Sequence, residues 1–412
     1  MLENKQKILK FPKGFLWGVS TAAYQIEGGI YNDWSEWEKS EARKRELEKN
    51  SKKHANFVAG LACDSYNKYK EDSDLAKKLN CNAYRFGIEW ARIEPEKGKW
   101  SEKGVEHYRE VLQDLKKKDL KIVLTLWHWT NPIWFSEEGG WANKKAVDYF
   151  SRYVKFVVNE LGDLVDYWIT LNEPMVHISN GYLVGIFPPN KKSPVKAYQV
   201  FKNLVKAHKV GYEIIHKRFS DAKVSFTNLT NFFEPARKWC LVEVLFAKLA
   251  DWFWNGSFPR RTKGYFDYIG LDYYFHDRIV WYPPFKKNKN QEVTDMGWEI
   301  YPEGIYWSLK SLSKFGKPII IIENGLADAD DKKRADFIIN HLKYVHQAIS
   351  DGIDVRGYFH WSLIDNFEWA EGFDPKFGLY KVDQKTCQRI ARPSAKVYAE
   401  ICKSNIIKIS KL

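Results

Sequence analysis

The chain has 412 residues, enough for one large domain or two to three average ones, and its 44% hydrophobic content is ordinary for a globular protein. Its longest apolar runs have the length of strands, so no membrane span is expected. The formal net charge of +13 would suit a nucleic acid or an anionic surface, but basic and acidic residues alternate through most of the chain. We therefore interpret the charge as a solvated surface and expect no nucleic-acid partner.

The compartment is predicted from the first residues and from the cysteines. Residues 1–13 are mostly polar and lack the apolar core of a signal peptide. The five cysteines are scattered, odd in number and without the spacing of metal ligands; they are Cys63, Cys81, Cys240, Cys387 and Cys402. This pattern fits a reducing compartment and gives no disulfide framework. The sequence therefore predicts a cytoplasmic protein.

Short apolar or β-branched runs recur along the chain and alternate with amphipathic stretches. The eight runs are 15–20, 83–88, 122–127, 167–171, 224–228, 268–273, 318–322 and 355–361. Intervening segments such as 105–115 and 337–349 repeat their apolar residues at helical spacing. Eight strands alternating with helices, with no obvious linker, predict the α/β class and a single (β/α)8 TIM barrel over residues 1–412. A doubly wound open sheet is the alternative, but no Gly-x-Gly-x-x-Gly follows an early strand.

Two segments depart from this alternation. Residues 39–53 are almost entirely charged or polar, which predicts a surface helix or loop after the first strand. Residues 239–258 contain a dense aromatic cluster that includes Trp252, Phe253 and Trp254. Such a cluster could contact a membrane or a partner, but we favour a barrel helix packed against the strands, because buried helices can be apolar on most faces.

Two glutamates follow predicted strands directly. Glu173 lies in Asn172-Glu173-Pro174, after the fourth apolar run, and Glu323 lies in Ile322-Glu323-Asn324-Gly325, after the seventh. Residues just past the end of a barrel strand lie at the mouth of the barrel, where ligands bind. Two such carboxylates can cleave a glycosidic bond, because one protonates the leaving oxygen while the other attacks the anomeric carbon or activates water.

Further polar and aromatic residues recur at the predicted strand ends. They are Gln25 and Glu27 after the first strand, Arg85 on the second, Trp127-His128-Trp129 at the third, Asp272-Tyr273-Tyr274 at the sixth, and Trp361 with Asn366-Phe367-Glu368-Trp369 after the eighth. Each of these taken alone has a structural explanation as a core or solvated side chain. Their joint placement predicts a polar pocket with aromatic walls that suits a sugar.

The same motifs resemble glycoside hydrolase family 1, the β-glucosidase and β-galactosidase family, over nearly the whole chain, and most of all its compact archaeal-type β-glycosidases. The matching runs are 11–18, 24–28, 82–86, 125–129, 170–174, 323–325 and 361–369. The resemblance implies a retaining, exo-acting hydrolase of non-reducing-end β-D-glucosides, and also of galactosides and fucosides. β-Mannosidase or transglycosylase activity on the same scaffold is an alternative, as is an inactive sugar-binding homologue.

The resemblance also implies roles for individual residues. Glu323 would be the nucleophile, with its pKa lowered by Arg85, and Glu173 the general acid and base, with its pKa raised by Glu323. Tyr274 would position Glu323. The sugar contacts would come from Gln25, Arg85, His128, Trp129, Asn172, Tyr274, Trp361, Glu368 and Trp369.

Glu368 bears on the substrate, because family members acting on 6-phosphorylated sugars usually have a small hydroxyl residue there and a carboxylate would repel phosphate. A non-phosphorylated small-molecule β-glycoside is therefore the expected partner. No cofactor and no metal are expected, because two carboxylates suffice for the chemistry. The sequence is compatible with a homo-oligomer.

One residue departs from the family pattern at the predicted site. Asp272 stands where the family usually has Asn, two residues before Tyr274. An extra carboxylate could raise the pKa of the nucleophile, or it could pair with a neighbouring cation and change little. The hypothesis is that Asp272→Asn moves the acidic limb of the pH–rate profile.

Overall fold

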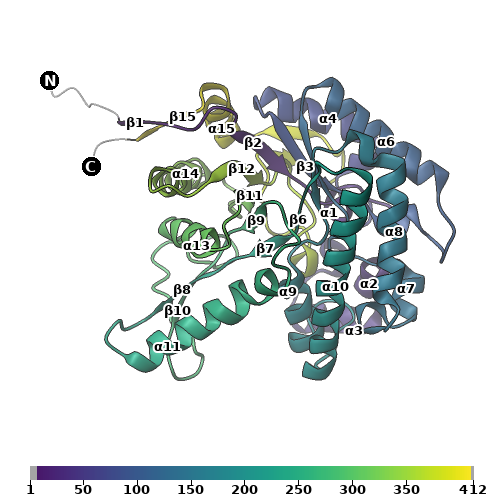
Figure 1. Cartoon of the computed structure of the whole chain (residues 1–412), viewed down its shortest axis with the longest axis horizontal. Helices are drawn as coiled ribbons and strands as arrows, with labels where there is room; N and C mark the ends of the chain where they lie inside the picture. The colour runs from purple at the N-terminus through teal and green to yellow at the C-terminus, as the bar shows by residue number, and fades with distance from the viewer. Residues whose placement is uncertain (1–6, 410–412) are drawn as a thin grey trace.

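A closed barrel of parallel strands forms the centre of this computed structural model, which describes residues 7–409 (Figure 1). The strands in chain order are β2 (Leu16–Ser20), β3 (Ala83–Gly87), β4 (Lys121–Thr125), β5 (Tyr167–Ile169), β6 (Lys223–Ser225), β7 (Thr227–Leu229), β9 (Ile269–Asp272), β11 (Ile319–Asn324) and β12 (Val355–Trp361). β6 pairs with β5 and β7 pairs with β9, and only Phe226 separates β6 from β7. These two pieces act as one fifth strand that closes the barrel, so the predicted (β/α)8 barrel is confirmed.

Helices surround the barrel, as Figure 1 shows. The long ones are α4 (Ser65–Lys78), α6 (Glu102–Lys117), α8 (Ala146–Leu161), α10 (Pro194–Arg218), α13 (Glu303–Ser313), α14 (Arg334–Ser350) and α15 (Pro393–Ser404). The two helical stretches predicted from apolar spacing correspond to α6 and α14, which bury Leu112 and Leu115, and Ile338 and Leu342. Those apolar stripes therefore face the strands, as amphipathic helices of a barrel do.

Shorter elements occupy the connections. The helices are α1 (Ala23–Ile26), α2 (Asp33–Lys39), α3 (Glu41–Lys49), α5 (Trp90–Ile93), α7 (Ile133–Glu137), α9 (Pro174–Ile178), α11 (Leu241–Ala250) and α12 (Ser257–Arg261), with the single turns η1 (His54–Phe57), η2 (Gly140–Ala142), η3 (Gly162–Leu164), η4 (Ser179–Val184), η5 (Asp251–Asn255) and η6 (Trp369–Glu371). The small sheets pair β1 (Lys7–Lys10) with β15 (Ile406–Ile409), β8 (Phe232–Pro235) with β10 (His276–Ile279), and β13 (Tyr380–Val382) with β14 (Arg389–Ala391). Residues 39–53, predicted as a surface helix or loop, contain helix α3.

The period of two in the strands divides the core into two parts. Val123 of β4 and Ile320 of β11 belong to a small cluster inside the barrel, whereas Leu124 and Ile321 belong to the large cluster between strands and helices. Alternate side chains of a strand point to opposite faces, so each strand supplies both parts. The interior of the barrel is therefore packed with apolar side chains, and polar residues gather at the carboxyl ends of the strands.

The aromatic segment 239–258 differs from its prediction. Phe258 of α12 is buried in the core, but α11 packs against β8 and β10, outside the barrel, and leaves most of its apolar side chains exposed. The favoured interpretation, a helix packed against the barrel strands, is thus wrong for α11. The aromatic cluster showed that this segment is rich in apolar side chains, but it did not show what covers them. Among residues 7–409, no helix is both long and apolar enough to cross a bilayer.

Candidate active site

A cavity of about 440 Å³ opens at the carboxyl ends of the barrel strands. Most of the residues predicted from the sequence line it, namely Gln25, His128, Trp129, Glu173, Tyr274, Glu323, Trp361, Glu368 and Trp369. Arg85 and Asn172 lie behind this wall, fully buried, and hold its side chains from below. The predicted residues therefore come together in one place, although they derive from seven separate stretches of chain.

Glu323 owes its direction to an irregularity in β11. Ile320 and Ile322 point into the barrel, so strict alternation would send Glu323 outward. The register of β11 with β9 shifts between Ile321 and Glu323, as in a β-bulge, and the carboxylate joins the cavity. Bulges next to active sites commonly redirect a side chain in this way.

Both oxygens of Glu323 are held by buried donors. Arg85 Nη1 donates to Oε1 over 2.6 Å, and Tyr274 Oη donates to Oε2 over 3.0 Å. Arg85 itself is fixed by Thr125 Oγ1, to which its Nε donates over 2.9 Å. The carboxylate thus has one cation and one hydroxyl in fixed positions, which favour its charged form.

Glu173 reaches the cavity from the turn between β5 and α9. Its backbone has φ of 41°, in the left-handed region, and Pro174 begins α9 immediately after it. The Glu173 N–H donates to Thr227 Oγ1 over 3.1 Å, and the Thr227 hydroxyl donates to Asn172 Oδ1 over 2.9 Å. Asn172 Oδ1 also accepts from Arg85 Nη2 at 2.5 Å. Arg85 and Thr227 therefore connect the local structure around both glutamates.

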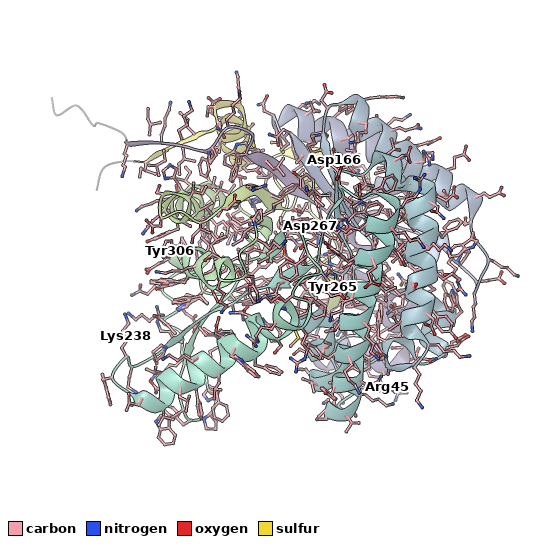
Figure 2. The ribbon with its side chains drawn as sticks, viewed as in Figure 1. Arg45, Asp166, Lys238, Tyr265, Asp267 and Tyr306 are labelled. Atoms are coloured by element: carbon pink, nitrogen blue, oxygen red, sulfur yellow. The ribbon has the colours of Figure 1, made fainter. Side chains whose placement is uncertain are left out.

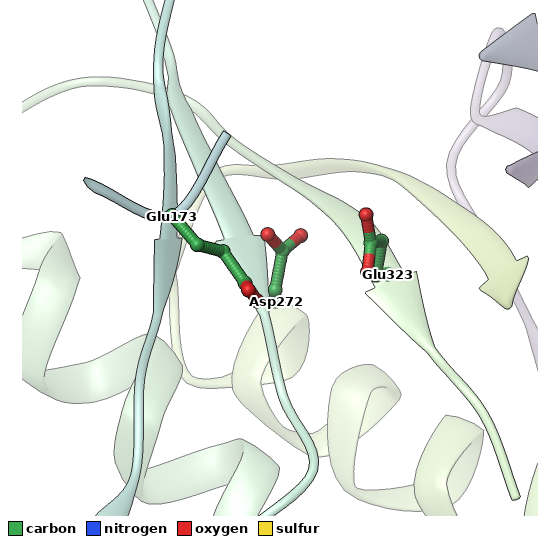
Figure 3. A group of neighbouring side chains, drawn as sticks. All are labelled: Glu173, Asp272 and Glu323. Atoms are coloured by element: carbon green, nitrogen blue, oxygen red, sulfur yellow. The ribbon is translucent and has the colours of Figure 1, made fainter. Parts of the chain in front are cut away.

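A third carboxylate lies between these two (Figure 3). Asp272 ends β9 and is fully buried. It points inward by simple alternation, because Tyr268, four residues earlier and just before the strand, belongs to the cluster inside the barrel. One oxygen from each of Glu173, Asp272 and Glu323 lies within 4.8 Å of the other two. Within residues 7–409, neither oxygen of the Asp272 carboxyl group has a hydrogen-bond partner. None of the ion pairs formed within residues 7–409 includes Asp272, so the pairing with a neighbouring cation that the sequence left open is not found there.

Burial dominates the electrostatics of this trio. It raises the pKa of Glu323 above its ordinary value, although Arg85 and Tyr274 oppose the rise. Arg85 thus lowers the pKa of Glu323, as expected from the sequence, but burial outweighs its effect. Burial and the charge of Glu323 raise the pKa of Asp272 much further. Burial, Asp272 and Glu323 together raise the pKa of Glu173 well above its usual range.

The order of these shifts follows from the contacts. Glu323 alone has two donors on its carboxylate, and it is the group whose pKa is raised least. Like charges within a few ångströms disfavour a second ionisation, so the first charge resides on Glu323. The pKa of Glu173 is raised well above that of Glu323, so Glu173 keeps its proton to higher pH. In geometric terms the three oxygens could also bind one cation, which would compete with these protonation states.

The opposite wall of the cavity combines polar groups with aromatic rings. Glu368 Oε2 accepts from Asn366 Nδ2 over 2.9 Å and from Gln25 Nε2 over 3.3 Å. Burial raises the pKa of Glu368 to about 8. The rings of Trp129 and Trp369 pack with their centroids 4.7 Å apart beside this carboxyl group. A pyranose ring, which has apolar C–H faces and hydroxyl groups around its edge, matches this combination of aromatic rings and hydrogen-bonding groups.

The outer part of the cavity comes from residues that the sequence did not single out as a site. It includes Asn180, Ile186, Phe187, Asn231, Trp254, Phe275, Asp277, Lys286, Met296 and Trp298. These residues lie on the long connections that follow β5, β7 and β9, whose course no strand pattern predicts. Only Trp254 had a signal, as part of the aromatic cluster in 239–258.

Comparison with known proteins supplies the family. The model of "Glycosyl hydrolase family 1" matches residues 7–269 and 260–407. The 1,4-beta-D-glucan glucohydrolase of Thermotoga neapolitana is 34% identical over 96% of this chain and 99% of its own length. The beta-galactosidase of Pyrococcus woesei is 30% identical over 96% of this chain and 97% of its own length.

Solved structures agree with these relatives. A beta-glycosidase from Pyrococcus horikoshii superposes with a TM-score of 0.87 at 38% identity, covering 97% of this chain and 96% of its own. A family 1 β-glucosidase from Thermotoga maritima gives a TM-score of 0.90 at 32% identity, covering 97% and 99%. This chain belongs to glycosyl hydrolase family 1 and is a glycoside hydrolase.

Proposed function

We propose that this enzyme is an exo-acting retaining β-glycosidase that removes non-reducing-end β-D-glucose, and also galactose and fucose, from non-phosphorylated glycosides. The observation that carries the proposal is the placement of Glu323 and Glu173, whose oxygens lie within 4.8 Å in an aromatic-walled cavity. Retaining enzymes keep their two carboxyl groups about 5 to 5.5 Å apart, whereas inverting enzymes need about 6.5 to 9.5 Å to admit water between them.

In the first step Glu323 attacks the anomeric carbon while Glu173 donates its proton to the leaving oxygen. Arg85 and Tyr274 keep Glu323 ionised and aimed, and the raised pKa of Glu173 keeps it protonated. The glycosidic bond breaks and a covalent glycosyl–Glu323 ester forms. Esterification removes the charge that raised the pKa of Glu173, which then accepts a proton from water. That water attacks the ester and releases the sugar with its β configuration retained.

The glycone is proposed to lie in the cavity against the wall formed by Gln25, Glu368 and the tryptophans. Glu368 and Gln25 would hydrogen-bond ring hydroxyls, while Trp361 and Trp369 would cover the apolar face of the ring. His128 and Asn172 complete this wall, joined by a 3.0 Å contact between Asn172 Nδ2 and His128 Nε2. Glu323 and Glu371 lie near enough to Glu368 to raise its pKa, and this group of acidic residues would repel a phosphate on the sugar. The names of the relatives, a glucan glucohydrolase and a beta-galactosidase, support the glycone range.

Two experiments test this function. The first is hydrolysis of a panel of p-nitrophenyl β-glycosides by wild type, Glu173→Gln and Glu323→Gln, where each variant should lose activity by orders of magnitude. The second identifies by proton NMR the anomer released first from a β-glucoside. We expect the β anomer; the α anomer would contradict the retaining mechanism. A silent β-glucoside, β-galactoside and β-fucoside panel with folded protein would contradict the substrate assignment.

The wider setting is also proposed. A cytoplasmic location is supported by the five cysteines, all of them free thiols in the structure. No nucleic-acid partner is proposed, since the sequence has no motif for one. One domain over residues 1–412 fits the single barrel, and its oligomeric state can be read by light scattering on the purified protein.

A further inference from the structure

Helix α11 and the turn η5 expose one continuous apolar stripe. Its members are Leu241, Val242, Leu245, Phe246, Leu249, Trp252 and Phe253, with exposed fractions from 37% to 82%. Their spacing of three, four and seven residues places them on one face of the helix. Figure 2 shows side chains with rings along the outer edge of α11, pointing away from the barrel, and Lys238 at the end of this helix.

The opposite face of α11 fixes this orientation. Glu243 and Ala247 are buried there against β8 and β10. The Glu243 carboxylate accepts from Arg237 Nε over 3.1 Å and from Arg237 Nη2 over 2.5 Å. A buried carboxylate paired in this way would be costly to expose without its partner. The helix is therefore held with its acidic residue inward and its leucines and aromatic residues outward.

The loop after β10 continues the apolar surface. Trp281, Tyr282 and Phe285 are 52%, 38% and 52% exposed. The backbone of Trp281 hydrogen-bonds to the same Glu243 carboxylate, which places the loop beside the first turn of α11. We call the seven residues of α11 and η5 and these three together the apolar edge. An edge of this composition is unusual for a surface that faces only water.

The exposed charges around the apolar edge are mainly basic, although Lys286 pairs with Asp277 and Asp251 is half-buried. Lys238 precedes α11, Lys248 is an exposed residue within it, and Arg260 stacks over Trp252 at 4.6 Å from the ring centre. The loop 281–290 carries three lysines, all exposed, and no acidic residue. On α11 and η5 the acidic residues are the buried Glu243 and the half-buried Asp251. Lys238, Lys248, Lys287 and Lys289 form no ion pair within residues 7–409. The edge therefore presents apolar side chains bordered by free cations.

We propose that the apolar edge docks this enzyme on a lipid bilayer surface that carries anionic headgroups. Leucine and phenylalanine side chains would enter the boundary of the acyl chains, and tryptophan and tyrosine would sit at headgroup level. The lysines and Arg260 would contact the anionic headgroups. A second copy of the chain is the less suitable occupant, because a two-fold contact would bring these cations together without acidic partners.

Docking at this edge would also orient the active-site cavity. Trp254, in the turn that ends the stripe, and Lys286, next to Phe285, both line the cavity. The cavity entrance and the apolar edge are therefore built from the same two segments of chain. A docked enzyme would hold its cavity entrance close to the headgroup layer, within reach of glycosides that partition into the bilayer.

The test is co-sedimentation with vesicles of equimolar phosphatidylglycerol and phosphatidylcholine, compared with vesicles of phosphatidylcholine alone. Wild type should bind the anionic vesicles more tightly, and high salt should weaken that binding. The variant Leu241→Gln/Leu245→Gln/Trp252→Gln should lower the partition coefficient by about tenfold or more. Lys238→Gln/Lys248→Gln/Lys287→Gln should lower binding to the anionic vesicles only.

The matched control is Val195→Gln/Tyr198→Gln/Ile390→Gln, which removes three exposed apolar side chains elsewhere on the surface. It should bind vesicles as wild type does. Hydrolysis of a soluble p-nitrophenyl glycoside should be unchanged in all three variants, which shows that they are folded. Wild type that fails to bind vesicles, or equal loss in the control, overturns the proposal. A wild-type dimer that only the Leu241/Leu245/Trp252 variant dissociates overturns it as well, since a second copy would then cover the edge.

Discussion

Arg85 and Glu323 form an ion pair of 2.6 Å in which the guanidinium is fully buried and the carboxylate is 6% exposed. In the described part of the chain, Arg85 is the only cation that forms an ion pair with any of the three carboxylates, and its partner is Glu323. A buried pair of this kind is costly to break, because the remaining partner keeps an uncompensated charge. The protonation of the whole site therefore depends on this one arginine.

Removing Arg85 should move the acidic limb of the pH–rate profile. Arg85 opposes the effect of burial on Glu323, so Arg85→Met should raise the pKa of Glu323 further. The acidic limb of kcat/KM should then shift to higher pH, and kcat/KM at its optimum should fall by about a hundredfold to a thousandfold. The matched control is Arg92→Met, which breaks the Arg92–Glu27 pair (2.8 Å) away from the cavity. An unchanged acidic limb in Arg85→Met would contradict this account.

Asp272→Asn should move the alkaline limb of the pH–rate profile. Asp272 is, after burial, the largest cause that raises the pKa of Glu173, whereas it is not among the causes acting on Glu323. The variant should therefore lower the pKa of Glu173 and move the alkaline limb to lower pH, with the acidic limb in place. This differs from the hypothesis drawn from the sequence, which assigned Asp272 to the acidic limb. Profiles of kcat/KM for wild type, Asp272→Asn and the control Asp277→Asn decide between the two limbs.

Sugar binding should depend on the ionisation of Glu368. Its pKa of about 8 leaves the carboxyl group largely neutral at pH 7 and charged at pH 9. A charged carboxylate accepts hydrogen bonds about twice as strong as a neutral one, so glucose should bind more tightly as the pH rises through this range. Calorimetric titration with glucose measures the effect. In Glu368→Gln the dependence should disappear, and in the control Glu371→Gln it should remain; dependence that persists without Glu368 would refute its role.

Gly325 should tolerate no side chain. A Cβ at this position would lie 1.7 Å from the backbone oxygen of Trp361, which cannot move without displacing the end of β12. Gly325→Ala should cost about 3 kcal/mol of unfolding free energy, since overpacking against backbone is not relieved by a rotamer change. Activity should fall as well, because Trp361 lines the cavity. Gly87→Ala is the control, with its nearest neighbour 3.7 Å away. Equal melting temperatures for the two variants would contradict the prediction.

The sequence was sufficient for the barrel because a parallel barrel imposes a simple rule on its strands. Most of the strands are short, apolar and end at a polar or aromatic residue, and this rule predicts Glu173 after β5 and Glu323 at the end of β11. The bulge that turns Glu323 inward left no mark in the sequence, yet the residue was found because its position at the strand end did not depend on it.

Three properties could not be read from the sequence. The pKa of Glu323 reflects a contest between burial and Arg85, and only the enclosed geometry shows that burial prevails. The second property is which face of α11 points toward the protein. Periodicity marks Leu241, Leu245 and Leu249 as one face, but the choice of inner face is made by Glu243 and its pairing with Arg237. The outer wall of the cavity, with Trp298 as an example, lies on connections without any repeating pattern.

The pairing of β1 with β15 makes the chain nearly circular. Lys7 lies opposite Ile409 and Lys10 opposite Ile406, so the first and last strands run side by side at one end of the molecule (Figure 1). Phe11 continues this junction by donating its N–H to the carbonyl oxygen of Asn405 over 3.0 Å. Fraying of either strand therefore exposes the hydrogen-bonding edge of the other, and the two strands should come apart together. A short linker joining the two strands would remove that weak point, and new ends could then be cut into a surface loop far from the cavity.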